Sequence, residues 1–165
     1  MNSVATASHL PALSEPHERE ALGRELEATL HDLVSLSLIG KQLHWAVVGQ
    51  LFRPLHLQLD ELVASWRDLS DVVAERAVAL GYVPDGQAQA VAAGAEIDQV
   101  ARTSIEDRRV VRELADRIAK VTELARTRMD RLGEIDVASQ DVLTDVVRKL
   151  EEQQWMFRAQ LVGRS

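Results

Sequence analysis

The sequence predicts an all-α protein, built as an up-and-down bundle of four long helices. Glycine and proline are sparse, with eight and four in 165 residues, and they fall between long segments. In these segments the apolar residues recur every three or four positions, which is typical of amphipathic helices, and none alternates as a strand does. The segments reach about 30 residues, a length that suits a helix bundle.

The first two helices are separated by a short turn. The first is expected over residues 16–48, where leucines follow a helical spacing, and Gly49 ends it. Pro54 suits the first turn of the second helix, because its missing N–H costs no hydrogen bond there. The second helix continues to about Leu80, since Gly81 is a typical residue just past a helix C-terminus.

A long connector separates the second helix from the third. Residues 81–100 have room for a short extra helix around 87–93, and a connector of this length can cross the bundle. The third helix, expected over residues 105–132, would then run parallel to the second. Gly133 ends it, and Asp136 or Ser139 can cap the fourth.

Composition limits the class of protein. Residues 1–15 are expected to be a flexible tail and 16–165 one bundle domain. The chain has no cysteine, which excludes disulfides and thiolate metal sites. It shows neither an apolar run that could span a membrane nor a signal peptide, which is compatible with a cytoplasmic protein. The formal charge is −7, so the basic surface that binds nucleic acid is absent.

The second helix carries a polar stripe and a separate apolar stripe. At about 100° per residue, with His56 at zero, Asp60 falls near ~40°. Asp71 and Glu75 fall near ~60° and ~100°. The apolar stripe, near ~−100°, must face the bundle core, and it consists of Leu55, Leu59, Leu62, Trp66, Leu69, Val73, Ala77 and Leu80. The polar stripe is therefore expected to face away from the core.

These potential metal ligands cannot meet within one copy of the helix. Asp60 and Asp71 lie ~16 Å apart along it, whereas ligands must come within about 2.0–2.6 Å of their ion. In a two-fold dimer of antiparallel helices, the residue numbers of each pair have a constant sum. The sum is 131 for Asp60 with Asp71, and again 131 for His56 with Glu75. A dimer would thus form two identical sites, each closed by His44.

The chemistry of such a site follows from its donors. Nitrogen and oxygen ligands without sulfur suit iron(II), manganese(II) or zinc. The alternative is a solvated helix face on which Arg67 and Arg76 neutralise the acids. A metal site inside a single bundle would need Glu-x-x-His motifs, which the chain lacks.

Residues 41–86 carry a set of spaced motifs, KQLHWAVVGQLFRPLHLQLDELVASWRDLSDVVAERAVALGYVPDG. They contain His-Trp, a glycine, an aromatic residue, a second histidine with an aspartate four residues later, Asp-x-x-x-Glu-Arg and Leu-Gly-x-x-Pro-x-Gly. This pattern closely resembles that of the Dps family (DNA-binding protein from starved cells), also called mini-ferritins. The likeness continues at ASQDVLTDVVRKLEEQQWMFRAQL and covers nearly the whole chain apart from the N-terminal tail.

The resemblance implies a ferritin-like four-helix bundle, with a short extra helix in the connector between the second and third helices, and a hollow shell of twelve subunits. It implies a ferroxidase that oxidises iron(II), preferably with hydrogen peroxide rather than oxygen, and stores the iron(III) mineral, protecting the cell from oxidative damage. Each site would take up to two iron ions, for which zinc or manganese can substitute. The implied metal ligands and catalytic groups are His44, His56 and Asp60 of one subunit with Asp71 and Glu75 of its two-fold partner.

Two further features follow from the resemblance. Trp45 is a candidate electron donor that intercepts one-electron oxidants; packing is the alternative, and for Trp155 the favoured one. Family shells also have acidic pores near the start of the last helix. The candidates for iron entry here are Glu134, Asp136 and Asp141, although acids near a helix N-terminus are also expected for capping.

Two rival functions remain open. Some family members condense DNA through tails rich in lysine and arginine, but residues 1–13 contain neither, so we expect no appreciable DNA binding near neutral pH. A structural helical oligomer without iron chemistry is the other, and the five intact ligand positions argue against it. His31 lies off the motif and is expected to be an ordinary surface or core residue.

Overall fold

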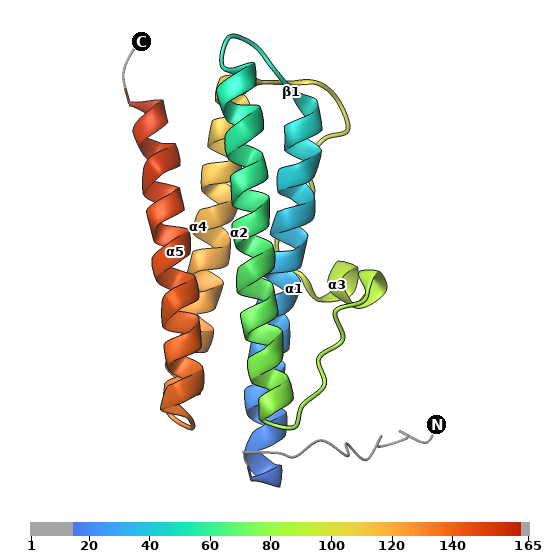
Figure 1. The fold of residues 1–165 in the computed structure, drawn as a ribbon, viewed down its shortest axis with the longest axis vertical. Coiled ribbons are helices and arrows are strands. Elements are labelled where there is room, and N and C mark those ends of the chain that lie inside the picture. Colours follow the sequence, from blue (N-terminus) through green and yellow to red (C-terminus); the bar gives the residue numbers. More distant parts are fainter. Residues whose placement is uncertain (1–14, 163–165) are drawn as a thin grey trace.

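The computed structural model describes residues 15–162 and is dominated by helices (Figure 1). The long helices are α1 (Pro16–Ala46), α2 (Phe52–Ala79), α4 (Asp107–Gly133) and α5 (Val137–Leu161), and the connector holds the short α3 (Ala88–Gly94). The predicted bundle with one extra helix is thereby confirmed. The predicted tail lies outside the described residues, except for Glu15.

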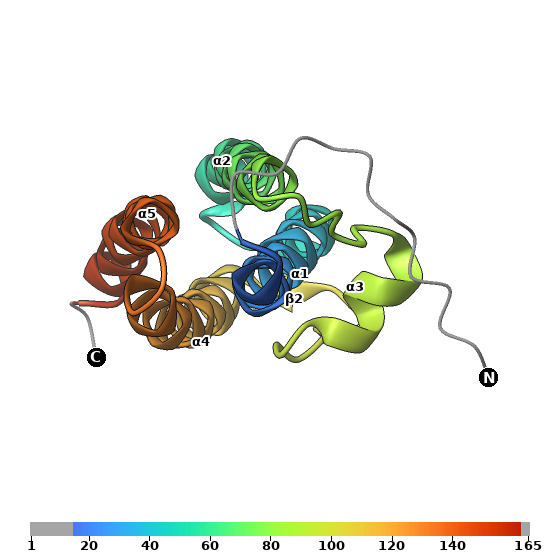
Figure 2. The ribbon, with the colours of Figure 1, turned by 90° about the horizontal axis from the view of Figure 1, so that it is seen from below.

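The connector crosses the bundle from one end to the other, as its length predicts. It leaves the lower end of α2 in Figure 1 and reaches the upper end of α4, so that these two helices run parallel. Figure 2 shows the four long helices in cross-section, with α3 outside the bundle beside α1. None of the helices in the described part of the chain combines the length and apolar character that a bilayer span requires.

Two short strands differ from the predicted elements, and they change the end of α1 and move the start of α4 from residue 105 to Asp107. The first helix ends at Ala46, two residues before the expected end, and β1 (Val47–Val48) follows it. This short strand pairs in parallel with β2 (Ile105–Glu106), with Val47 opposite Ile105. A strand of two residues has no alternation to detect, so the sequence pattern could not reveal the pair.

The core lies along the predicted apolar stripe. On α2 the stripe residues are buried, with Leu69 half-buried, and Trp66 is completely enclosed. The Nε1–H of Trp66 donates to Oε1 of Gln153 at 2.8 Å, which ties α2 to α5. The predicted orientation of α2 is therefore confirmed, and its polar stripe faces away from the core.

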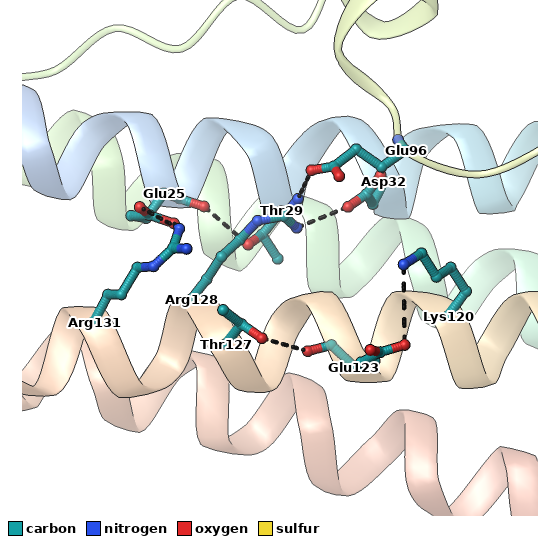
Figure 3. Close-up of polar contacts among 9 residues, drawn as sticks. All are labelled: Glu25, Thr29, Asp32, Glu96, Lys120, Glu123, Thr127, Arg128 and Arg131. Atoms are coloured by element: carbon teal, nitrogen blue, oxygen red, sulfur yellow. Dashed lines mark hydrogen bonds and ion pairs between the residues drawn. The ribbon is translucent and has the colours of Figure 1, made fainter.

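A buried polar cluster fixes the connector to the bundle (Figure 3). Arg128 on α4 donates from Nη1 to Oδ2 of Asp32 on α1 at 2.7 Å, and from Nη2 to Oε1 of Glu96 at 2.9 Å. The backbone N–H of Glu96 in turn donates to Oδ1 of Asp32 at 2.7 Å. Both Arg128 and Asp32 are buried, so the ion pair is shielded from solvent.

Candidate metal centre

Two histidines meet at the turn between α1 and α2. His44 lies in the last turn of α1 and His56 near the start of α2. The Nδ1 of His44 lies 2.9 Å from the carbonyl oxygen of His56, and the Nδ1 of His56 lies 3.0 Å from that of His44. The two rings stack with their centroids 3.6 Å apart. The predicted proximity of the two imidazoles is thus observed within one chain.

These reciprocal hydrogen bonds determine which nitrogen of each ring can bind a metal. A carbonyl oxygen only accepts hydrogen bonds, so Nδ1 must carry the proton in both rings. The Nε2 of each neutral ring then keeps its lone pair. Metal-binding histidines commonly have this arrangement, because a hydrogen bond from the other nitrogen fixes the tautomer and the ring orientation.

Asp60 lies beside the histidines, one turn after His56. Its Oδ1 is 3.4 Å from Nδ1 of His44 and forms an ion pair with Nζ of Lys41. The hydrogen bond from Lys41 holds the pKa of Asp60 below its ordinary value, and the positive charge of Lys41 acts in the same direction. Asp60 is therefore an anionic donor at neutral pH, and an incoming cation competes with Lys41 for it.

Asp71 and Glu75 lie farther along α2, on the same face and exposed to solvent. Neither has a hydrogen-bond or ion-pair partner among residues 15–162. Since α2 is one continuous helix, Asp71 stays ~16 Å from Asp60 along its axis. No three histidine or acidic groups in the described chain are placed to hold one metal ion. The shared site across a two-fold interface stays a prediction, and the single chain supplies two separate halves of it.

The ligand face of α2 also carries exposed apolar side chains. Leu57 is 49% exposed and Val78 is 37% exposed, and on the helical scale both fall within the polar stripe, near ~100° and ~40°. Trp45, next to His44, is 68% exposed. These apolar side chains would be removed from water if a second chain packed on this face.

The tryptophan and pore candidates have different surroundings. Trp45 is exposed and stays a candidate electron donor, and Trp155 is 67% exposed, so it does not pack inside its own chain. Glu134 and Asp141 are also exposed. Asp136 is half-buried and serves the fold, because it caps α5 by accepting from the backbone N–H of Ser139 at 3.0 Å. Iron entry past these three acids stays a prediction.

Asp136 also joins α5 to the ligand-bearing helix. Its Oδ2 lies 2.6 Å from Nη2 of Arg76, the residue after Glu75, and Nε of Arg76 donates to Oγ of Ser139 at 3.0 Å. Burial raises the pKa of Asp136, but the hydrogen bonds from Ser139 and the charge of Arg76 outweigh it and hold this pKa below its ordinary value. The carboxylate therefore stabilises the fold in its ionised form.

Asp136→Asn is expected to lower the free energy of unfolding by about 1 kcal/mol at neutral pH, because the cap survives but the ion pair is lost. A carboxylate whose pKa is lower in the folded protein stabilises the fold at pH values above its pKa in the unfolded chain, about 3.9. This stabilisation is lost as the pH falls toward the lower pKa of the folded protein. The difference between wild type and variant should therefore shrink below about pH 4. Urea unfolding across pH measures it, with the exposed Asp141→Asn as control; a pH-independent difference would contradict this role.

Lys41 is a site residue that periodicity did not reveal. The sequence shows it one helical turn before His44, but its partner Asp60 lies on the next helix. The only available signal was a lysine near three predicted ligands in a chain that has just two other lysines, Lys120 and Lys149. Its position makes Lys41 a counter-ion that neutralises the site when no metal ion is present.

Comparison with known proteins gives the family. A family model described as the ferritin-like domain matches residues 24–163. The chain is 31% identical over 158 residues to the DNA protection during starvation protein of Mycolicibacterium smegmatis, covering 94% of this chain and 85% of that protein. It is 28% identical over 153 residues to DNA protection during starvation protein 2 of Deinococcus radiodurans, covering 93% of this chain but only 63% of the relative's length.

A solved structure of a Dps protein has a similar fold. The Dps of Microbacterium arborescens, described as being in the high iron form, superimposes with a TM-score of 0.86 at 28% identity. The match covers 93% of this chain and 100% of the other. The family model and the relative from Mycolicibacterium each cover most of the chain, in agreement with the fold. The chain therefore belongs to the Dps mini-ferritins, a branch of the ferritin-like family.

Proposed function

We propose that this protein oxidises iron(II) with hydrogen peroxide and stores the resulting iron(III) inside a shell of twelve subunits. The observation that carries the proposal is the reciprocal histidine pair, in which hydrogen bonds to carbonyl oxygens fix both Nδ1 atoms and leave both Nε2 atoms free. Two pre-oriented nitrogen donors next to an anionic Asp60 form half of a site for a divalent transition metal.

The second half of the site would come from a two-fold partner. Antiparallel pairing of two α2 helices about a point between Ser65 and Trp66 brings the His56 end of one helix to the Glu75 end of the other. The exposed carboxylates of Asp71 and Glu75 support this arrangement, because no other described group occupies them. The exposed Leu57 and Val78 on the same face would become buried in the dimer.

The proposed reaction uses iron as substrate and peroxide as oxidant. Two iron(II) ions each lose one electron, and hydrogen peroxide takes up both electrons and two protons as its O–O bond breaks, giving two water molecules. Three carboxylates per shared site favour the higher charge of iron(III), and the two imidazoles complete the donor set. Because both electrons are delivered at one place, the hydroxyl radical that a single electron would produce is avoided.

Both the metal and the oxidant in this proposal have chemical alternatives. Iron(II) is the proposed substrate, and zinc and manganese(II) suit the same nitrogen and oxygen donors and would compete with it. Oxygen is the alternative oxidant, with a lower rate expected. The solved relative in the high iron form supports iron as the cargo of this family's shells.

The test of this function is an anaerobic titration. The protein is loaded with iron(II), hydrogen peroxide is added, and two quantities are recorded: the rate of oxidation and the amount of iron(III) that stays soluble with the protein. Fast oxidation with retention of iron supports the proposal. Oxidation no faster than in buffer would overturn it, and the helical oligomer without iron chemistry would take its place.

The second candidate function is DNA protection, which the names of the relatives from Deinococcus radiodurans and Mycolicibacterium smegmatis suggest for those proteins. Acidic residues outnumber lysine and arginine by 26 to 19 in this chain, so electrostatics oppose binding to phosphates near neutral pH. Protection of DNA would then be indirect, through removal of iron(II) and peroxide.

Lys41→Gln is expected to tighten the binding of zinc to the metal-free protein by about 2- to 5-fold, because Asp60 loses its competing partner and the ion pair is partly exposed. Isothermal titration with zinc measures the change without any redox step. Lys120→Gln removes the same charge from α4, where the Nζ lies 3.9 Å from Glu123, and serves as control. Equal tightening in both variants would indicate a general charge effect and contradict a competition at Asp60.

A further inference from the structure

A carboxylate from the other half of the bundle holds the turn that brings the two histidines together. Asp107, the first residue of α4, is buried, at 5% exposure. Its Oδ2 accepts a hydrogen bond from the backbone N–H of Leu51 at 2.7 Å, and its Oδ1 accepts one from the N–H of Arg108 at 2.7 Å. Leu51 is the N-cap residue of α2 and makes no side-chain cap of its own. Asp107 therefore anchors the start of α2 from 56 residues away.

The turn is shaped to admit this carboxylate. Gly49 has a φ of +125°, a conformation that residues with a side chain rarely adopt. A Cβ at Gly49 would also lie 2.5 Å from Oδ2 of Asp107, so the close approach needs glycine for a second reason. The parallel pairing of β1 with β2 also holds these two segments together.

The charge of Asp107 suits this role. The hydrogen bond from Leu51 holds the pKa of Asp107 below its ordinary value, although burial opposes the effect. A negative charge is also favourable here because it lies at the N-terminal ends of both α2 and α4. The buried carboxylate thus stays ionised, and it links the two helix pairs at the end of the bundle where the histidines lie.

We infer that Asp107 is the positioning residue of the histidine pair, and that it sets the metal affinity of the pair without touching the metal. The inference depends on the proposed function only in taking iron(II) as the metal that the histidines bind. The two reciprocal hydrogen bonds require the end of α1 and the start of α2 to keep one relative position. The seven residues from Gly49 to Leu55 include the only turn between them, and Asp107 holds that turn. Loss of this anchor lets the helix start shift and releases both imidazoles.

Nitrogen NMR of the metal-free, assembled protein with labelled histidine tests the inference. Wild type should show His44 and His56 as fixed Nδ1–H tautomers, assigned by single substitutions. His31 is an internal reference, because its Nε2 lies 2.8 Å from the carbonyl oxygen of Asp85, far along the chain from Asp107. Asp107→Ala should average the tautomers of His44 and His56 and leave His31 unchanged.

Zinc affinity gives the second readout. Asp107→Ala is expected to weaken binding by about 10-fold, the low end for residues that support metal ligands. Asp116→Asn is the matched control, because it removes a carboxylate from an exposed position farther along α4 that makes no contact with the turn. Asp107→Asn should restore part of the affinity, since its amide oxygen can still accept from Leu51.

Two further results keep the test decisive. If Asp107→Ala fails to fold, Gly49→Ala replaces it, because its Cβ displaces the carboxylate while Asp107 remains. Unchanged tautomers and zinc affinity in a folded variant of either kind would overturn the inference. Wild-type protein that fails to oxidise iron would refute the proposed function alone, because the tautomers are measured without metal.

Discussion

Glu75→Gln slows peroxide-driven oxidation of iron(II) by about 100-fold or more, if Glu75 ligates iron as proposed, because loss of a charged ligand removes several kcal/mol of stabilisation from the iron centre. Glutamine keeps the length of the side chain and removes the charge. Glu75 is exposed and makes no contact that the fold depends on, so the helical content and assembly should stay as in wild type. The stopped-flow rate at saturating peroxide measures the effect.

The matched control lies on the same helix. Glu61 is also exposed and is not one of the predicted ligands; it lines the groove between α2 and α5, ~40° around the helix from Glu75 and ~21 Å from it along the axis. Glu61→Gln makes the same change in charge at a comparable site on α2 and should retain the wild-type initial rate. Equal losses in the two variants would mean that general surface charge, and not a ligand at Glu75, controls the rate.

Arg128→Leu is expected to lower the free energy of unfolding by about 3–5 kcal/mol. The substitution leaves Asp32 buried without its counter-charge and frees the carboxylate of Glu96. Both the core of the α1–α4 pair and the anchor of the connector are affected. Urea unfolding at one fixed chain concentration measures the change, since assembly contributes to stability.

Two comparisons separate the buried charge from other causes. Arg131 lies one turn farther along α4 and pairs with Glu25 at 3.2 Å, but its side chain is 62% exposed (Figure 3). Arg131→Leu should therefore cost about 0–1 kcal/mol. Adding Asp32→Asn to Arg128→Leu removes the unpaired charge and keeps an acceptor for the N–H of Glu96, so the double variant should be more stable than the single one. A double variant that is no more stable would contradict the buried-charge explanation.

The parts of this structure that the sequence predicted are those set by local periodicity. The apolar stripe of α2 has a single orientation that buries Trp66, and this orientation alone determines that Asp60, Asp71 and Glu75 face away from the core. The same periodicity gives their separation along the helix axis, from which a second copy of the chain was inferred. The orientation is confirmed, and the second copy stays a proposal.

The contacts that the sequence pattern did not predict join residues that lie far apart in the chain. Lys41 pairs with Asp60 across the turn, and Asp107 reaches Leu51 from the start of α4. A local pattern shows that a residue is charged but not which of many distant groups it will contact. The two-residue strands are too short to have a pattern at all, and they changed the end of α1 from Val48 to Ala46.

A mixed assembly tests the shared site most directly. One chain carries His44→Ala and His56→Ala, and the other carries Asp71→Asn and Glu75→Gln; each alone should be inactive. When equal amounts are reassembled together, half of the dimers are mixed, and each of these contains one site with all its ligands intact. A shared site therefore predicts recovery of about a quarter of the wild-type oxidation rate. No recovery in assemblies shown to contain both chains would contradict a site built from two subunits.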